Sequence, residues 1–106
     1  MDPSLMYQAA RERQVDVISA FSTDGRIVAF DLVVLEDDRQ AIPPYDAILL
    51  ASPKLVRERP EVVRALRQLS GSIDADRMRR MNLAVDQTGR SPREVAQEFL
   101  DGQKAQ

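Results

Sequence analysis

The sequence offers few side chains with which an enzyme could work. Histidine and cysteine are both absent from the 106 residues, which excludes zinc sites, thiol nucleophiles, serine–histidine triads and disulfides. The run from Glu36 to Asp38 resembles a paired-carboxylate or Mg²⁺ site. Consecutive residues of a strand point to opposite faces, however, so these carboxylates would need a dedicated loop to converge on one ion. We therefore expect a solvated strand end, and we predict no enzyme activity, no metal and no other cofactor.

Charge and composition exclude further classes of protein. Fifteen basic and seventeen acidic residues give a net charge of −2, and no basic block supplies the phosphate-neutralising surface of a nucleic-acid-binding protein. The cluster of Arg77, Arg79 and Arg80 is interrupted by Met78 and predicts a solvated helix face. No stretch approaches the roughly 20 apolar residues of a membrane span. The sequence thus predicts an ordinary globular chain of one domain at most.

The first half of the chain predicts an α/β arrangement. Residues 4–13 have apolar side chains at helical spacing, with Tyr7 packing within that helix, and residues 15–21 alternate as a strand does. Residues 27–35 are β-branched and aliphatic, which is typical of a strand buried on both faces, and residues 47–51 predict a third, short strand. So few strands leave sheet edges unpaired. This indicates a portion of something larger, or a chain that pairs with a second copy of itself.

Residues 22–25 predict a turn between the first two strands. The Asp24 carboxylate can accept a hydrogen bond from its own downstream backbone, and Gly25 tolerates a positive φ angle. Considered by itself, Phe21 is then a core aromatic at the end of a strand. Tyr45, which follows two prolines, is by the same reasoning a packing or interface residue.

The second half of the chain predicts four helices. Each begins with a proline in the first turn or with a capping side chain. The last start, residues 91–94, is a capping box with proline at the first helical position. Gly71 and Gly89 are expected to end the second and third of these helices. The expected starts are Ser52-Pro53, Arg59-Pro60, Asp74 and Ser91-Pro92.

One block is more specific than a generic strand and turn. Residues 15–27 read Val-Asp-Val-Ile-Ser-Ala-Phe-Ser-Thr-Asp-Gly-Arg-Ile. This block resembles one found in the substrate-binding proteins of osmoprotectant ABC importers, the glycine betaine, choline and carnitine class. Further similarities keep the family's order over nearly the whole chain: Leu5-Met6-Tyr7-Gln8-Ala9, residues 32–38, Pro43-Pro44-Tyr45, Pro60-Glu61-Val62, Met81-Asn82 and residues 95–100.

The resemblance implies an α/β fold of the type II periplasmic-binding-protein kind. In that fold two lobes are joined by crossing strands, and the ligand is enclosed in the cleft between them. This chain resembles the C-terminal portion only. Residues 1–26 would end the second lobe, residues 27–35 would form the hinge or crossing strand, and residues 36–106 would be the C-terminal part of the first lobe. We expect these parts to form one compact unit or a swapped dimer.

The resemblance also implies a site for a quaternary ammonium group. Such a group cannot donate a conventional hydrogen bond, so it is held by aromatic faces, each worth about 0.5–2 kcal/mol. Two cage residues of the family correspond to Phe21 and Tyr45, where the family usually has tyrosine at the first position. Phenylalanine keeps the ring and lacks the hydroxyl. Thr23 and Asp24, in the same turn, are further ligand-binding candidates, although turn formation is the favoured role of Asp24.

Two hypotheses for function follow. The first is a solute-binding component of an ABC-type importer for compatible solutes such as glycine betaine, choline or carnitine. It implies a permease subunit as partner, for which the arginine cluster is a candidate contact, and an extracytoplasmic parent protein whose targeting segment is absent from this chain. The second is a non-binding interaction or assembly domain derived from that fold, with a second copy as partner. Because the chain holds half a cage, we expect weak or no binding by the chain alone.

Overall fold

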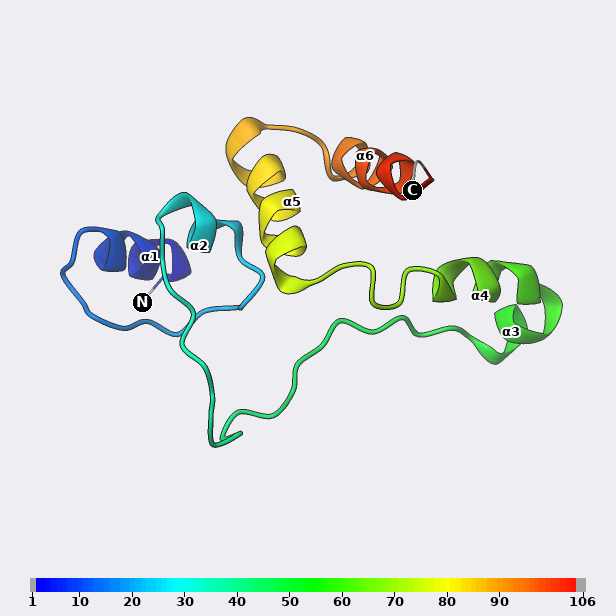
Figure 1. Cartoon of the computed structure of the whole chain (residues 1–106), viewed down its shortest axis with the longest axis horizontal. Coiled ribbons are helices and arrows are strands. Elements are labelled where there is room, and N and C mark those ends of the chain that lie inside the picture. Colours follow the sequence, from blue (N-terminus) through cyan, green and yellow to red (C-terminus); the bar gives the residue numbers. More distant parts are fainter. Residues whose placement is uncertain (1, 105–106) are drawn as a thin grey trace. The chain divides into compact units, whose positions relative to one another are not determined.

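The computed structural model describes residues 2–104, apart from the side chain of Pro3. Within these residues the structure is helical and contains no strand, and none of its helices has the length and apolarity needed to cross a membrane. The helices, labelled in Figure 1, are α1 (Pro3–Arg11), α2 (Gly25–Ala29), α3 (Pro53–Glu58), α4 (Pro60–Arg67), α5 (Ala75–Thr88) and α6 (Pro92–Lys104).

The helices expected in the second half begin where the sequence predicts them. The Asp74 carboxylate accepts a hydrogen bond from the Arg77 N–H at 2.7 Å and so caps α5. The capping box at α6 is confirmed, because the Ser91 N–H donates to the Glu94 carboxylate at 2.9 Å and the Glu94 N–H donates to Ser91 Oγ at 3.2 Å. Gly89 ends α5 with a φ of 67°, a left-handed conformation that glycine adopts without steric cost.

The three predicted strands are wrong for the described residues. Residues 17–21, 32–37 and 43–52 carry no regular secondary structure, and residues 25–29, partly expected in a strand, form α2. A strand exists only where it can exchange hydrogen bonds with a neighbouring strand, and no such neighbour is formed within residues 2–104. These segments therefore have a β-forming composition but form no sheet within the described residues.

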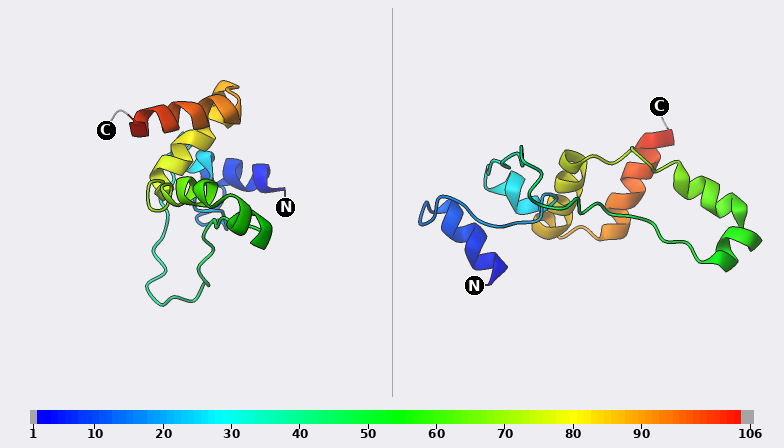
Figure 2. Two further views of the ribbon diagram at one scale, coloured as in Figure 1. Left: turned by 90° about the vertical axis from the view of Figure 1, so that its right-hand side faces the viewer. Right: turned by 90° about the horizontal axis from the view of Figure 1, so that it is seen from below.

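The chain divides into two units. The first comprises Met1–Val34 and Asp74–Gln106, and the second comprises Leu35–Ile73. In the first unit α2 lies against α5, and α5 contacts α6 after the turn that joins them (Figures 1 and 2). In the second unit the short helices α3 and α4 contact each other. The assignment of residues to lobes and a hinge stays a prediction.

The buried core of the described residues is small. Its apolar members are Tyr7, Ile27 and Val95, all in the first unit, and the predicted packing of Tyr7 is confirmed by its exposure of only 2%. The apolar stripes of α4 and α5 are only half-buried. Large apolar side chains are exposed in both units, among them Val17, Val33, Leu35, Ile42, Ile48, Leu49 and Leu50. Exposed apolar surface of this extent is typical of a face that other polypeptide covers.

Candidate functional site

Phe21 lies at the start of the turn that leads into α2. Its carbonyl oxygen accepts a hydrogen bond from the Asp24 N–H at 3.1 Å, which closes the turn. The Asp24 carboxylate caps α2 by accepting from the Arg26 N–H at 2.9 Å, so the predicted turn-forming role of Asp24 is confirmed. Phe21 is 70% exposed. The interpretation of Phe21 as a core aromatic is therefore wrong.

A compact cluster of Tyr7, Asp24 and Arg26 adjoins this turn. Arg26 donates twice to the Asp24 carboxylate, from Nε at 3.0 Å and from Nη2 at 2.7 Å, and its guanidinium lies 4.0 Å from the centre of the Tyr7 ring. The Arg26 hydrogen bonds hold the pKa of Asp24 below its usual value. Burial, followed by the nearby Asp24 charge, raises the pKa of Tyr7. The buried Tyr7 hydroxyl lies near that carboxylate but makes no hydrogen bond of good geometry within residues 2–104.

Two side chains of α5 hold the backbone of the same turn. Arg79 Nε donates to the carbonyl oxygen of Ser22 at 2.5 Å, and Asn82 Nδ2 donates to the carbonyl oxygen of half-buried Thr23 at 2.8 Å. The prediction that Arg79 belongs to a solvated face is wrong, because its side chain is only 15% exposed. Sequence reasoning missed both residues as parts of the site. Their spacing of three places them on one face of the helix, and that was the signal available.

Close contact between α2 and α5 completes the support of the turn. A Cβ atom at Gly25 would lie 2.6 Å from the backbone nitrogen of Leu83, far inside normal contact distance. Gly25 starts α2 and has no positive φ angle, so the sequence-based reason for this glycine is wrong. Glycine is needed here because no side chain fits between the two helix backbones.

Tyr45 belongs to the second unit, so its surroundings are described separately from those of Phe21. Tyr45 is 89% exposed, in a segment without regular secondary structure. A turn precedes it, in which the Asp37 carboxylate accepts from the N–H groups of Ala41 at 3.0 Å and Ile42 at 2.7 Å. These hydrogen bonds, that from Ile42 first, lower the pKa of Asp37. Asp37 thus shapes the loop that leads to Tyr45. Among residues 2–104 no cluster of three or more acidic side chains could hold a metal ion.

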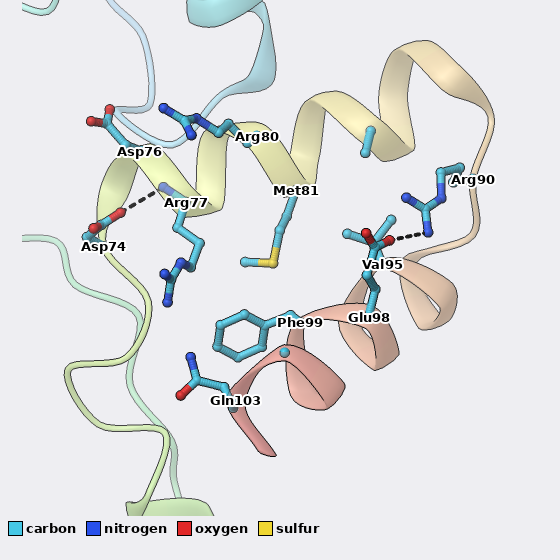
Figure 3. Close-up of a pocket in the computed structure, with 12 residues that line it drawn as sticks. Asp74, Asp76, Arg77, Arg80, Met81, Arg90, Val95, Glu98, Phe99 and Gln103 are labelled. Atoms are coloured by element: carbon cyan, nitrogen blue, oxygen red, sulfur yellow. Dashed lines mark hydrogen bonds and ion pairs between the residues drawn. The ribbon is translucent and has the colours of Figure 1, made fainter. Parts of the chain in front are cut away.

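A groove of about 580 Å³ lies between α5 and α6. Figure 3 shows Met81 and Phe99 pointing into it, with the Arg90–Glu98 ion pair, at 2.6 Å, on its rim. The Arg77 guanidinium lies 5.6 Å from the centre of the Phe99 ring. None of the four residues predicted as ligand-binding lines this groove. The groove is therefore separate from the candidate site around the Phe21 turn.

The candidate site thus consists of an exposed aromatic ring on a turn that α5 holds by two hydrogen bonds. Comparison with protein families shows what class of protein carries it. Residues 1–102 match the family described as the substrate binding domain of the ABC-type glycine betaine transport system. The chain belongs to this family.

The chain is also similar to individual transport binding proteins. The carnitine transport binding protein OpuCC of Listeria monocytogenes is 39% identical over 100 residues, covering 94% of this chain and 32% of that protein. The glycine-betaine-binding protein of Pseudomonas aeruginosa is 34% identical and covers 100% of this chain and 36% of its own length. The ergothioneine transport permease/ergothioneine binding protein EgtU of Helicobacter pylori is 31% identical over 101 residues, 95% of this chain and 18% of that protein.

The crystal structure of a glycine betaine/carnitine/choline ABC transporter superposes with a TM-score of 0.91 at 42% identity, over 96% of this chain and 38% of that chain. The predicted fold class, a portion of the α/β fold of these binding proteins, is confirmed by this similarity. The chain spans about a third of the length of the binding proteins from Listeria and Pseudomonas that it matches.

Proposed function

We propose that this chain contributes part of the ligand site of a solute-binding component in an ABC-type importer, and that the solute carries a quaternary ammonium group. The observation that carries the proposal is the exposed Phe21 ring on a turn whose backbone is fixed at both ends. A bound cation needs an aromatic face that is accessible and already oriented, because ordering a mobile ring on binding costs affinity.

In this proposal Phe21, in the first unit, and Tyr45, in the second, are each an aromatic face that contacts the solute. Both rings are exposed, and the resemblance to the family implies that their positions correspond to its cage residues. These two points support the proposal. The remaining faces, and the donors for the carboxylate of a zwitterionic solute, belong to the portion of the family fold outside this chain. Thr23 and Asp24 then form the turn that carries Phe21. Of the two, Thr23 is the better candidate for a direct ligand contact. Glycine betaine, choline and carnitine are the solutes proposed.

The partners and location proposed follow from the same assignment. A solute-binding component closes around its ligand and presents the closed form to a permease subunit. We propose an extracytoplasmic location for the protein, where an importer meets its solute. Arg77 and Arg80, which are exposed on α5, are candidate contacts for the permease.

A hybrid protein tests the proposal. The Listeria relative aligns with this chain over 100 residues, so replacing that segment of the relative with this chain supplies the rest of the fold. Calorimetric titration with choline, glycine betaine and carnitine should show binding. Phe21→Ala and Tyr45→Ala should each weaken binding by about 2- to 30-fold, the equivalent of one cation–π contact of about 0.5–2 kcal/mol.

Ring-preserving variants provide the matched controls. Tyr45→Phe and Phe21→Tyr retain both aromatic faces, so binding should stay within about threefold of the parent hybrid. A hybrid that gives a folded circular dichroism spectrum but binds none of the three solutes would count against the proposal. Unchanged affinity in both alanine variants would remove Phe21 and Tyr45 from the site.

The exposed apolar residues favour a second candidate function. Val33, Leu35 and the run Ile48-Leu49-Leu50 lie in segments without a strand partner, and such segments pair readily with another chain. This candidate is an assembly domain that pairs with a second copy and does not bind solute. Light scattering with and without millimolar choline separates the two. A stable dimer that is unaffected by choline, together with a hybrid that does not bind, would favour assembly.

A further inference from the structure

Two consecutive backbone carbonyl groups after Phe21 are held by side chains that lie far away in the sequence. The Ser22 carbonyl accepts from Arg79, 57 residues later, and the Thr23 carbonyl accepts from Asn82, 59 residues later. The Phe21 carbonyl is itself bound by the Asp24 N–H. The carbonyl groups of all three residues from Phe21 to Thr23 therefore have a defined hydrogen-bond partner, although the Phe21 side chain is exposed.

The side chain of Arg79 is unusually buried for an arginine on a helix. Its side chain is 15% exposed, while its ion-pair partner Asp76, at 2.5 Å, is 73% exposed. Withdrawing a guanidinium from water is unfavourable unless its donors are satisfied. One of those donors, Nε, is given to the Ser22 carbonyl. Arg79 thus links the first turn of α5 to the turn that carries Phe21.

We propose that Arg79 and Asn82 are positioning residues, which hold the Phe21 turn in the one conformation that presents its ring to ligand. The inference rests on the proposed function for the nature of the ligand, and it assigns to α5 a part of the site that touches no ligand itself. Fixing the backbone before binding removes an ordering cost that a mobile loop would otherwise add. Ligand affinity therefore depends on two hydrogen-bond donors, Arg79 and Asn82, that do not themselves touch the ligand.

Packing of α2 against α5 does not account for these two hydrogen bonds. The contact of Gly25 with the Leu83 backbone already brings the helices together, whereas Arg79 and Asn82 both donate to the turn before α2. A purely structural role predicts that their loss lowers overall stability. A positioning role predicts selective loosening of residues 21–24 in a chain whose helices remain folded.

Amide exchange measured by NMR on the full 106-residue chain separates these roles. Asn82→Asp keeps the size of the side chain and replaces the donor facing the Thr23 carbonyl with an oxygen acceptor. Exchange of the Asp24 amide, which donates to Phe21, should accelerate about tenfold or more, and Arg79→Met should act in the same direction. The matched control is Val95→Ala, which removes buried side chain from α6 without touching the turn.

The exchange rates can either support or overturn the positioning role of Arg79 and Asn82. Faster exchange confined to residues 21–24 in the two α5 variants, and absent in Val95→Ala, is the expected result. Unchanged exchange in both α5 variants would overturn the inference. So would equal loosening of the turn in the Val95→Ala control, because the effect would then be general loss of stability.

Titration of the hybrid protein and its Asn82→Asp variant with choline distinguishes failure of this inference from failure of the proposed function, because the chain alone is expected to bind weakly or not at all. If choline shifts the Phe21 amide resonance, Asn82→Asp should raise the apparent Kd at least about fivefold. An unchanged Kd in a variant whose turn has loosened would overturn the positioning role. Absence of any shift in the unmodified hybrid would count against the proposed function, while the exchange measurements on the 106-residue chain would still decide what Arg79 and Asn82 do.

Discussion

Replacement of Gly25 by alanine should be among the most damaging small substitutions in the first unit. The added Cβ atom would lie 2.6 Å from Leu83 N and 2.8 Å from Leu83 Cα, whereas carbon atoms pack at about 3.5–4.0 Å. Both neighbours are backbone atoms of α5, so α2 and α5 must separate by about 1 Å. Overpacking of this kind costs about 1–3 kcal/mol, and the helix propensity of alanine offsets at most about 0.5–1 kcal/mol. We expect net destabilisation of up to about 2.5 kcal/mol.

Gly102→Ala is the matched control for this prediction. Gly102 lies in α6 and a Cβ atom there meets nothing within 4 Å, so alanine should stabilise the chain by about 0.5–1 kcal/mol. Urea unfolding followed by far-ultraviolet circular dichroism compares the two variants with the parent chain. If Gly25→Ala proved as stable as Gly102→Ala, the close packing of α2 on α5 would be refuted.

Two further predictions concern the α6 cap and pH. Ser91→Ala removes the capping box of α6 and should lower the free energy of unfolding by about 1 kcal/mol, and an unchanged melting temperature would contradict this. Arg26 lowers the pKa of Asp24, so the folded state binds fewer protons than the unfolded state. The contribution of Asp24 to stability is therefore present above the ordinary carboxyl pKa and is lost as pH falls through the lowered value. Asp24→Asn should make the pH dependence of stability shallower below the ordinary carboxyl pKa of about 4, and an identical slope would contradict the role of this ion pair.

The helices other than α2 could be predicted because their determinants are local. The capping box at Ser91 and Glu94 needs only residues three apart, and its hydrogen bonds are formed as the sequence indicates. Gly89 supplies the left-handed residue that ends α5. Each of these signals lies within one helical turn of the boundary that it sets, so the rest of the fold is not needed to read it.

The strands could not be predicted correctly, because a strand is not a local structure. Residues 27–35 have the β-branched composition of a buried strand, yet α2 includes Ile27–Ala29. Asp24 caps that helix and α5 offers it a packing surface, while strand partners are not formed within residues 2–104. Composition indicates what a segment favours once a sheet exists, and it carries no information on whether the sheet is present.

The candidate site likewise has one part that is encoded locally and one part that depends on distant residues. The turn at Asp24 is encoded within three residues and could be predicted, whereas the donors that fix it come from 57 and 59 residues away. Arg79 and Asn82 bind backbone carbonyls, which every residue possesses, so the side chains of Ser22 and Thr23 do not reveal the contact. Arg79 also stands beside exposed arginines on α5, which hides its different environment. Hydrogen bonds from side chains to a distant backbone become visible only when the fold places the two segments side by side. Their importance for binding then depends on how rigidly Phe21 must be held.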